Sequence, residues 1–335
     1  MTYKYILKIA FIYTGTILGA GFATGKELLS FFGQFNKIGI LGFFLACFLL
    51  SLTCMSILDS VYKTKANTYS KFLNNLFGKY GVYIEWFNIC LLFMLFSGML
   101  AGGGATLSNV FDINEILSMC IFCIMTLIAL IFGKNAIITI NTILCPILII
   151  GGILIGIYSY FQVTPVFNSN VKALISPFIY TSYNGITTIS VLFAIKDIVT
   201  NKKVVIYSSI LGGIFILSIG IFMLIPLIKH YEYIQNSTLP MLKLVENKEL
   251  IKNVYGITVL CAIFTTAVSN GVTLESAFDE KYNTKGISLK IIIILLGILF
   301  SLMGFSSIVN IVYPIFGVIG MFEILVIIIR FFVSK

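Results

Sequence analysis

Charged residues are scarce in this sequence. Asp, Glu, Lys and Arg make up 10% of its 335 residues, whereas 59% of the residues are hydrophobic. A soluble domain has about 25% charged and about 45–50% apolar residues. The chain therefore has too few polar residues to cover a water-soluble fold. This excludes a soluble enzyme or a disordered chain and predicts an integral membrane protein.

Histidine occurs once, and recognisable catalytic motifs are missing. The single His230 excludes a histidine metal cluster or a catalytic triad that contains histidine. The sequence has no GxSxG, P-loop or HExxH pattern, and its polar residues form no recognisable catalytic set. The seven cysteines all lie in apolar runs and cannot all pair, so no disulfide framework is implied. We expect neither an enzyme nor a bound cofactor.

The net charge of +9 comes from 22 Lys and Arg against 13 Asp and Glu. The basic residues are scattered singly between apolar runs, which indicates loop anchoring at the membrane and not nucleic-acid binding. If both termini are cytoplasmic, the inner segments hold more than twice as many Lys and Arg as the outer ones. We therefore predict a multi-pass protein of the cell membrane with both termini inside and an even number of spans.

The apolar runs predict ten membrane spans within a single transmembrane domain, residues 1–335. They lie approximately at residues 9–32, 38–61, 82–110, 115–133, 136–161, 173–199, 204–228, 253–277, 287–304 and 307–333. They divide into two blocks of five, approximately 5–161 and 173–333. Because five is odd, the second block has the opposite orientation in the membrane, as in transporters built from inverted repeats.

Two spans contain residues that disfavour a continuous helix. The first has four glycines between positions 15 and 25, and each costs about 1 kcal/mol relative to alanine in a helix. The sixth has Pro177 followed by Ser182-Tyr183-Asn184-Gly185. The two segments are half a chain apart, and interrupted helices at matching positions of inverted halves are typical of a secondary-transporter site. The alternative is that the glycines only allow close helix packing.

An interruption near Leu18 would expose peptide groups to a ligand. Carbonyl oxygens at the end of the first half-helix would attract a cation, and the N–H groups of Gly19 to Gly21 would attract a carboxylate. Ser182 to Asn184 on the sixth span would contact the other end of the solute. The candidate substrate-binding residues are Gly19, Ala20, Gly21, Phe22, Tyr180, Ser182, Tyr183 and Asn184.

The same residues resemble a known family. The run from Gly19 to Glu27, GAGFATGKE, resembles the GAGFATGxE signature of YkvI-type membrane proteins, and Ser182-Tyr183-Asn184 is similar to the SYN motif of that family. The resemblance implies an amino acid permease of the amino acid–polyamine–organocation superfamily. It also implies the LeuT fold, an all-α membrane fold of ten helices in a 5+5 inverted repeat with helices 1 and 6 interrupted.

Within the implied fold, sodium symporters hold a cation between the first and eighth spans. The eighth span has the matching order of a carbonyl at Ala262 and hydroxyls at Thr265 and Thr266. The sodium ligands implied by the resemblance are Gly15, Leu18, Ala262, Thr265 and Thr266. The alternative is that the two threonine hydroxyls only bond back to their own helix.

Three ionisable residues within the predicted spans are candidates for gating or coupling: Lys26, Glu27 and Glu323. Ionisable groups at membrane depth mark function by default. We expect a sodium-coupled transporter of a small carboxylate-bearing solute, with a small-molecule substrate and the lipid bilayer as its partners. Proton coupling is an open alternative, as is a ligand sensor on a transporter fold without flux, and the oligomeric state is open.

Overall fold

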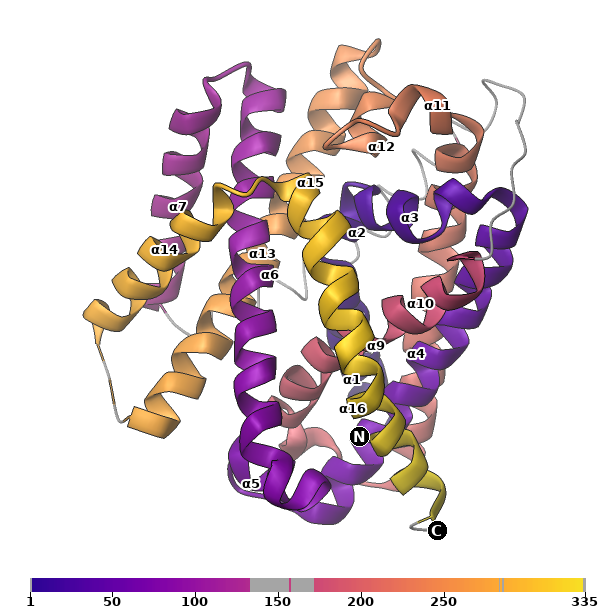
Figure 1. Cartoon of the computed structure of the whole chain (residues 1–335), viewed down its shortest axis with the longest axis vertical. Helices are drawn as coiled ribbons and strands as arrows, with labels where there is room; N and C mark the ends of the chain where they lie inside the picture. Colours follow the sequence, from indigo (N-terminus) through magenta and orange to yellow (C-terminus); the bar gives the residue numbers. More distant parts are fainter. Residues whose placement is uncertain (1, 133–156, 158–171, 283, 285, 334–335) are drawn as a thin grey trace.

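The computed structural model describes residues 2–132, 172–282 and 286–333, together with residues 157 and 284. This part of the chain is almost entirely helical (Figure 1). The long helices are α1 (Thr2–Ile17), α4 (Asn36–Thr64), α6 (Gly81–Phe111), α7 (Glu115–Phe132), α9 (Lys172–Ala194), α10 (Lys202–Lys229), α13 (Glu249–Tyr282), α14 (Ile287–Ser301) and α16 (Tyr313–Val333). The short α-helices are α2 (Ala20–Ala23), α3 (Lys26–Phe31), α5 (Tyr69–Phe77), α11 (Tyr231–Ile234), α12 (Pro240–Lys243) and α15 (Phe305–Ser307).

The helices follow the predicted spans closely. Among the described residues, six helices are long and apolar enough to cross a membrane. The fifth predicted span, 136–161, lies outside the described residues. Both termini lie at one end of the molecule, opposite α11 and α12 (Figure 1), as an even number of spans requires. Which end faces the cytoplasm stays a prediction.

The first span is interrupted at the predicted place. Helix α1 ends at Ile17, Gly19 has an extended backbone, and α2 begins at Ala20. A second turn follows at Gly25, whose φ of 79° lies in the left-handed region that favours glycine. As a result α2 and α3 run across the upright helices near the end that carries α11 and α12 (Figure 1).

The predicted interruption of the sixth span is wrong. Helix α9 is continuous from Lys172 to Ala194 and includes Pro177. The polar groups are satisfied without unwinding, because Ser182 donates to the Phe178 carbonyl (2.7 Å) and Asn184 donates to the Tyr180 carbonyl (3.1 Å).

Close packing at glycines brings α6 against the segment that precedes α16. A Cβ added at Gly98 would lie 3.1 Å from the Ile308 side chain, and one at Gly102 would lie 3.0 Å from Phe305. Helix α6 also packs on α13, while α9 packs on both α4 and α16. These contacts place α3, α6, α9 and the start of α16 around one buried region.

Candidate functional site

Glu27 lies in the first turn of α3 and is only 4% exposed. The turn at Gly25 reverses the chain, so the Glu27 side chain lies back over Gly21 of α2. A Cβ added at Gly21 would overlap the Glu27 carboxyl group. The carboxylate of Glu27 therefore fills the space beside one of the glycines that we predicted to face the substrate.

Tyr183 connects this carboxylate to the sixth span. The Tyr183 hydroxyl donates a hydrogen bond to Oε2 of Glu27, and both side chains are buried. The first and sixth spans therefore meet through a side-chain contact, although α9 is not interrupted. Sequence reasoning placed Glu27 and Tyr183 in separate roles and did not predict this bond.

Aromatic rings surround the Glu27–Tyr183 pair. The Tyr183 ring centroid lies 5.5 Å from that of Tyr180, 5.5 Å from that of Phe31 and 5.0 Å from that of Tyr313. The hydroxyls of Tyr180 and Tyr313 are buried and have no hydrogen-bond partner among the described residues. We name Phe31, Tyr180, Tyr183 and Tyr313 the aromatic cluster. Phe31 and Tyr313 were missed at sequence level because aromatic residues are common throughout the chain.

The other predicted substrate residues are buried but have local contacts. Gly19, Ala20 and Phe22 are all buried in or next to α2, and the Phe22 ring packs towards Phe43 of α4 with centroids 6.4 Å apart. Ser182 and Asn184 bond to carbonyls of their own helix, as described above. The structure thus brings Gly21 and Tyr183 together through Glu27, while ligand contacts of the remaining residues stay a prediction.

The predicted sodium ligands lie on neighbouring elements. A Cβ added at Gly19 would lie 3.5 Å from the Thr266 side chain, so the break in the first span faces α13. Thr265 and Thr266 both donate to the Ala262 carbonyl at 2.9 Å. This local bonding leaves the lone pairs of both hydroxyl oxygens available to a cation. The full set with Gly15 and Leu18 stays a prediction.

Lys26, the residue before Glu27, is also buried, but its side chain has a different hydrogen-bond partner. Its Nζ donates to the Ser237 carbonyl at 2.9 Å, in the segment between α11 and α12. The backbone N–H of Met241 donates to the Thr24 carbonyl at 3.0 Å. These two bonds attach the α11–α12 segment to the first span, and a gating role for Lys26 stays a prediction.

Glu323 forms a second buried acidic site on α16 and is 3% exposed. Asn88 donates from Nδ2 to Oε1 of Glu323 at 3.1 Å, and the same nitrogen lies 3.2 Å from the Tyr69 hydroxyl. Oε2 of Glu323 has no partner among the described residues. Asn88 was missed at sequence level, although a lone amide within an apolar span is a signal that would have found it.

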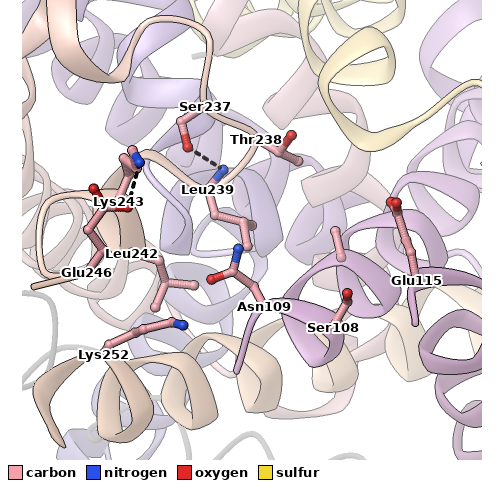
Figure 2. Close-up of a pocket in the computed structure, with 11 residues that line it drawn as sticks. Ser108, Asn109, Glu115, Ser237, Thr238, Leu239, Leu242, Lys243, Glu246 and Lys252 are labelled. Atoms are coloured by element: carbon pink, nitrogen blue, oxygen red, sulfur yellow. Dashed lines mark hydrogen bonds and ion pairs between the residues drawn. The ribbon is translucent and has the colours of Figure 1, made fainter. Parts of the chain in front are cut away.

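A surface cavity of about 400 Å³ lies at the end of the molecule that carries α11 and α12. It is lined by residues near the ends of α6 and α7, by the α11–α12 segment and by Lys252 at the start of α13 (Figure 2). Lys243 and Glu246 form an ion pair of 2.5 Å at its edge. None of the predicted site residues lines this cavity, so it is distinct from the site at Glu27.

The chain is an integral membrane protein with the LeuT fold, as the solved structures similar to it show. It resembles MhsT in complex with L-phenylalanine with a TM-score of 0.70 and 15% identity, over 95% of this chain and 87% of MhsT. It resembles Mhp1, a nucleobase-cation-symport-1 family transporter, with a TM-score of 0.69 and 13% identity, over 93% of this chain and 74% of Mhp1. For a Na⁺-coupled sialic acid symporter, the TM-score is 0.61 and the identity 15%, over 93% of this chain and 75% of that one.

Two relatives from Bacillus subtilis (strain 168) are similar over nearly the whole chain. The uncharacterized membrane protein YkvI is 24% identical over 94% of this chain and 92% of the relative. The uncharacterized protein YyaD is 24% identical over 100% of this chain and 99% of the relative. No protein-family model matches the chain. The similarity to YkvI agrees with the resemblance noted in the sequence, and membership of the amino acid–polyamine–organocation superfamily stays an expectation.

Proposed function

We propose that this protein is a secondary active transporter that moves a small solute across the cell membrane by alternating access. The observation that carries the proposal is the buried contact between Glu27 of the interrupted first span and Tyr183 of α9. Interrupted spans that line a central site are characteristic of secondary transporters. The similar folds of a nucleobase-cation-symport-1 family transporter and of a Na⁺-coupled sialic acid symporter support the proposal.

For the substrate we propose a small solute with a carboxylate, an amino acid in the first place. The bound L-phenylalanine in the structure of MhsT supports this choice. The proposed binding residues lie on the first span and α9, as named above. Because the Glu27 carboxyl fills the space over Gly21, a ligand carboxylate can reach the Gly19–Gly21 backbone only after Glu27 moves. Movement of α3 is therefore part of the proposed opening.

For the coupling ion we propose sodium at Gly15, Leu18, Ala262, Thr265 and Thr266. The approach of Thr266 to Gly19 supports this set. Protons are the alternative coupling ion, with the buried carboxyls of Glu27 and Glu323 as candidates.

Uptake into proteoliposomes tests the proposed function. Purified protein would be reconstituted, and uptake of labelled amino acids would be measured under an imposed sodium gradient, an imposed proton gradient, both and neither. Gradient-dependent, saturable accumulation supports a secondary transporter and identifies its coupling ion. Binding without accumulation under any gradient would instead identify a ligand sensor, and rapid flux that does not saturate would identify a channel.

A further inference from the structure

Glu27 is buried, and among the described residues the only hydrogen-bond partner of its carboxyl group is Tyr183. The neighbouring Lys26 is directed to the Ser237 carbonyl instead. Within the described part of the chain, the ion pairs are formed by other acids, and none includes Glu27. A buried carboxylate without a cation is costly, because burial removes its hydration and nothing of opposite charge replaces it. A proton or a cationic group of a ligand can therefore stabilise Glu27, and the ionised form requires the cation.

While Glu27 lies over Gly21 and is ionised, it disfavours a second anion at that place. Glu27 lies over Gly21, where the interrupted first span faces α9. Like charges repel strongly in a medium of low dielectric constant. A ligand that binds next to an ionised Glu27 is therefore stabilised by a cationic group at that position and destabilised by an anionic one.

The aromatic cluster supplies the rest of a site for an organic cation. Tyr183 donates to the carboxylate, and the rings of Tyr180 and Tyr313 pack against Tyr183 with centroids 5.5 and 5.0 Å from its own. The Tyr180 and Tyr313 hydroxyls are fully buried and lack partners among the described residues. Aromatic faces attract ammonium groups, and unpaired phenol oxygens can accept hydrogen bonds from N–H donors.

We propose that Glu27, together with Tyr180, Tyr183 and Tyr313, binds the ammonium group of the solute. The ligand class is therefore alkylammonium compounds, which include amines and the amine end of an amino acid, and a carboxylate without an amine does not bind. This inference rests on the proposed function in one respect: it takes the solute that binds at Glu27 to be the solute that is transported. The aromatic rings distinguish this site from the proposed sodium site between the first span and α13, whose proposed ligands are all oxygen atoms.

Thermal unfolding of the purified full-length protein with matched ligands tests the inference. The probes are L-phenylalanine, phenethylamine, N-acetyl-L-phenylalanine and 3-phenylpropanoate, with the corresponding series for leucine, alanine and lysine, each in sodium and in potassium chloride. Compounds with a free ammonium group are expected to raise the Tm by mass action, and the acetylated and amine-free compounds are not. The inference is overturned if the amine-free compounds stabilise equally, if only sodium raises the Tm, or if no ammonium compound in the panel does.

Two variants connect this binding to the named residues. Glu27→Gln keeps the shape of the side chain, and it is expected to weaken ammonium binding at least tenfold. Tyr313→Phe removes a hydroxyl that has no partner among the described residues, so the unliganded Tm should not fall, while ammonium binding weakens. The exposed Glu232→Gln is the control for loss of one negative charge. Unchanged ammonium binding in Glu27→Gln or Tyr313→Phe would contradict the assignment.

Comparison with proteoliposome uptake separates this inference from the proposed function. If ammonium compounds bind but no solute accumulates, the binding site stands and the transporter assignment is wrong. If solutes without an amine accumulate and ammonium compounds do not bind, the transporter assignment stands and the ammonium site is wrong.

Discussion

Asn88 and Glu323 are 235 residues apart in sequence, yet the Asn88 amide donates to the Glu323 carboxyl across 3.1 Å in the buried interior. The bond joins α6 to α16. The amide nitrogen also lies within hydrogen-bond distance of Tyr69 on α5, so three elements meet at one buried acid. The contact makes Glu323 a second buried acidic site in addition to Glu27.

Asn88→Ala is expected to destabilise the protein, because Glu323 would lose its hydrogen bond from Asn88 while staying buried. The loss of a partner of a buried polar group costs about 1–3 kcal/mol. Thermal unfolding would measure the effect. In the Glu323→Gln background the cost of Asn88→Ala should be smaller, since the charge is gone, and equal costs in both backgrounds would show that the two residues are not coupled.

Gly21→Ala is expected to impair both folding and uptake, because the new Cβ overlaps the Glu27 carboxyl group. Overpacking of this kind costs about 1–3 kcal/mol. Gly19→Ala is the matched control for stability, since its Cβ would have ordinary contacts, the nearest 3.5 Å away. Equal changes in Tm for the two variants would contradict the position of Glu27 over Gly21.

Gly25→Ala is expected to cost more stability than the strain of a left-handed alanine alone. Gly25 has φ 79° and ψ −1°, and alanine in the left-handed region costs about 1–2 kcal/mol. The added Cβ would also meet the Met241 side chain at 2.7 Å. The free energy of unfolding of Gly25→Ala, measured in the wild type and in the Met241→Ala background, reports this contact, and equal costs in both backgrounds would argue against the packing of α12 on the first span.

The double variant Thr265→Ala, Thr266→Ala is expected to abolish the sodium dependence of uptake or to raise the sodium concentration for half-maximal uptake at least tenfold. Both hydroxyls donate to the Ala262 carbonyl, and neither bond is needed to complete the helix, so the fold should persist. The double variant Thr265→Ser, Thr266→Ser keeps the oxygens and should keep the sodium dependence. Unaltered dependence in the alanine variant would remove α13 from the cation site.

The membrane spans could be predicted from the sequence, because the length of each run of apolar residues is enough to identify them. The break in the first span was also predictable, since glycines at Gly15, Gly19 and Gly21 weaken the helix there. The same reasoning was wrong at α9. There Ser182 and Asn184 bond within their own helix, and a composition argument cannot tell side chains that satisfy a helix from those that open it.

The position of Glu27 could not be predicted. It depends on the left-handed turn at Gly25, and that turn is set by tertiary packing. The pairing of Asn88 with Glu323 is likewise a contact between distant segments. Sequence identified Glu27 and Glu323 as residues of interest because charges are rare in apolar spans, but their partners required the fold.

The bonds from Lys26 to Ser237 and from Met241 to Thr24 have a consequence for how the first span can move. They attach the α11–α12 segment on both sides of the left-handed turn at Gly25, and Glu27 follows Lys26 directly. A displacement of α3 that withdraws Glu27 from Gly21 must therefore break these bonds or move the α11–α12 segment as well. Under the proposed alternating access, opening at this end of the molecule and freeing the space over Gly21 would be one coupled motion.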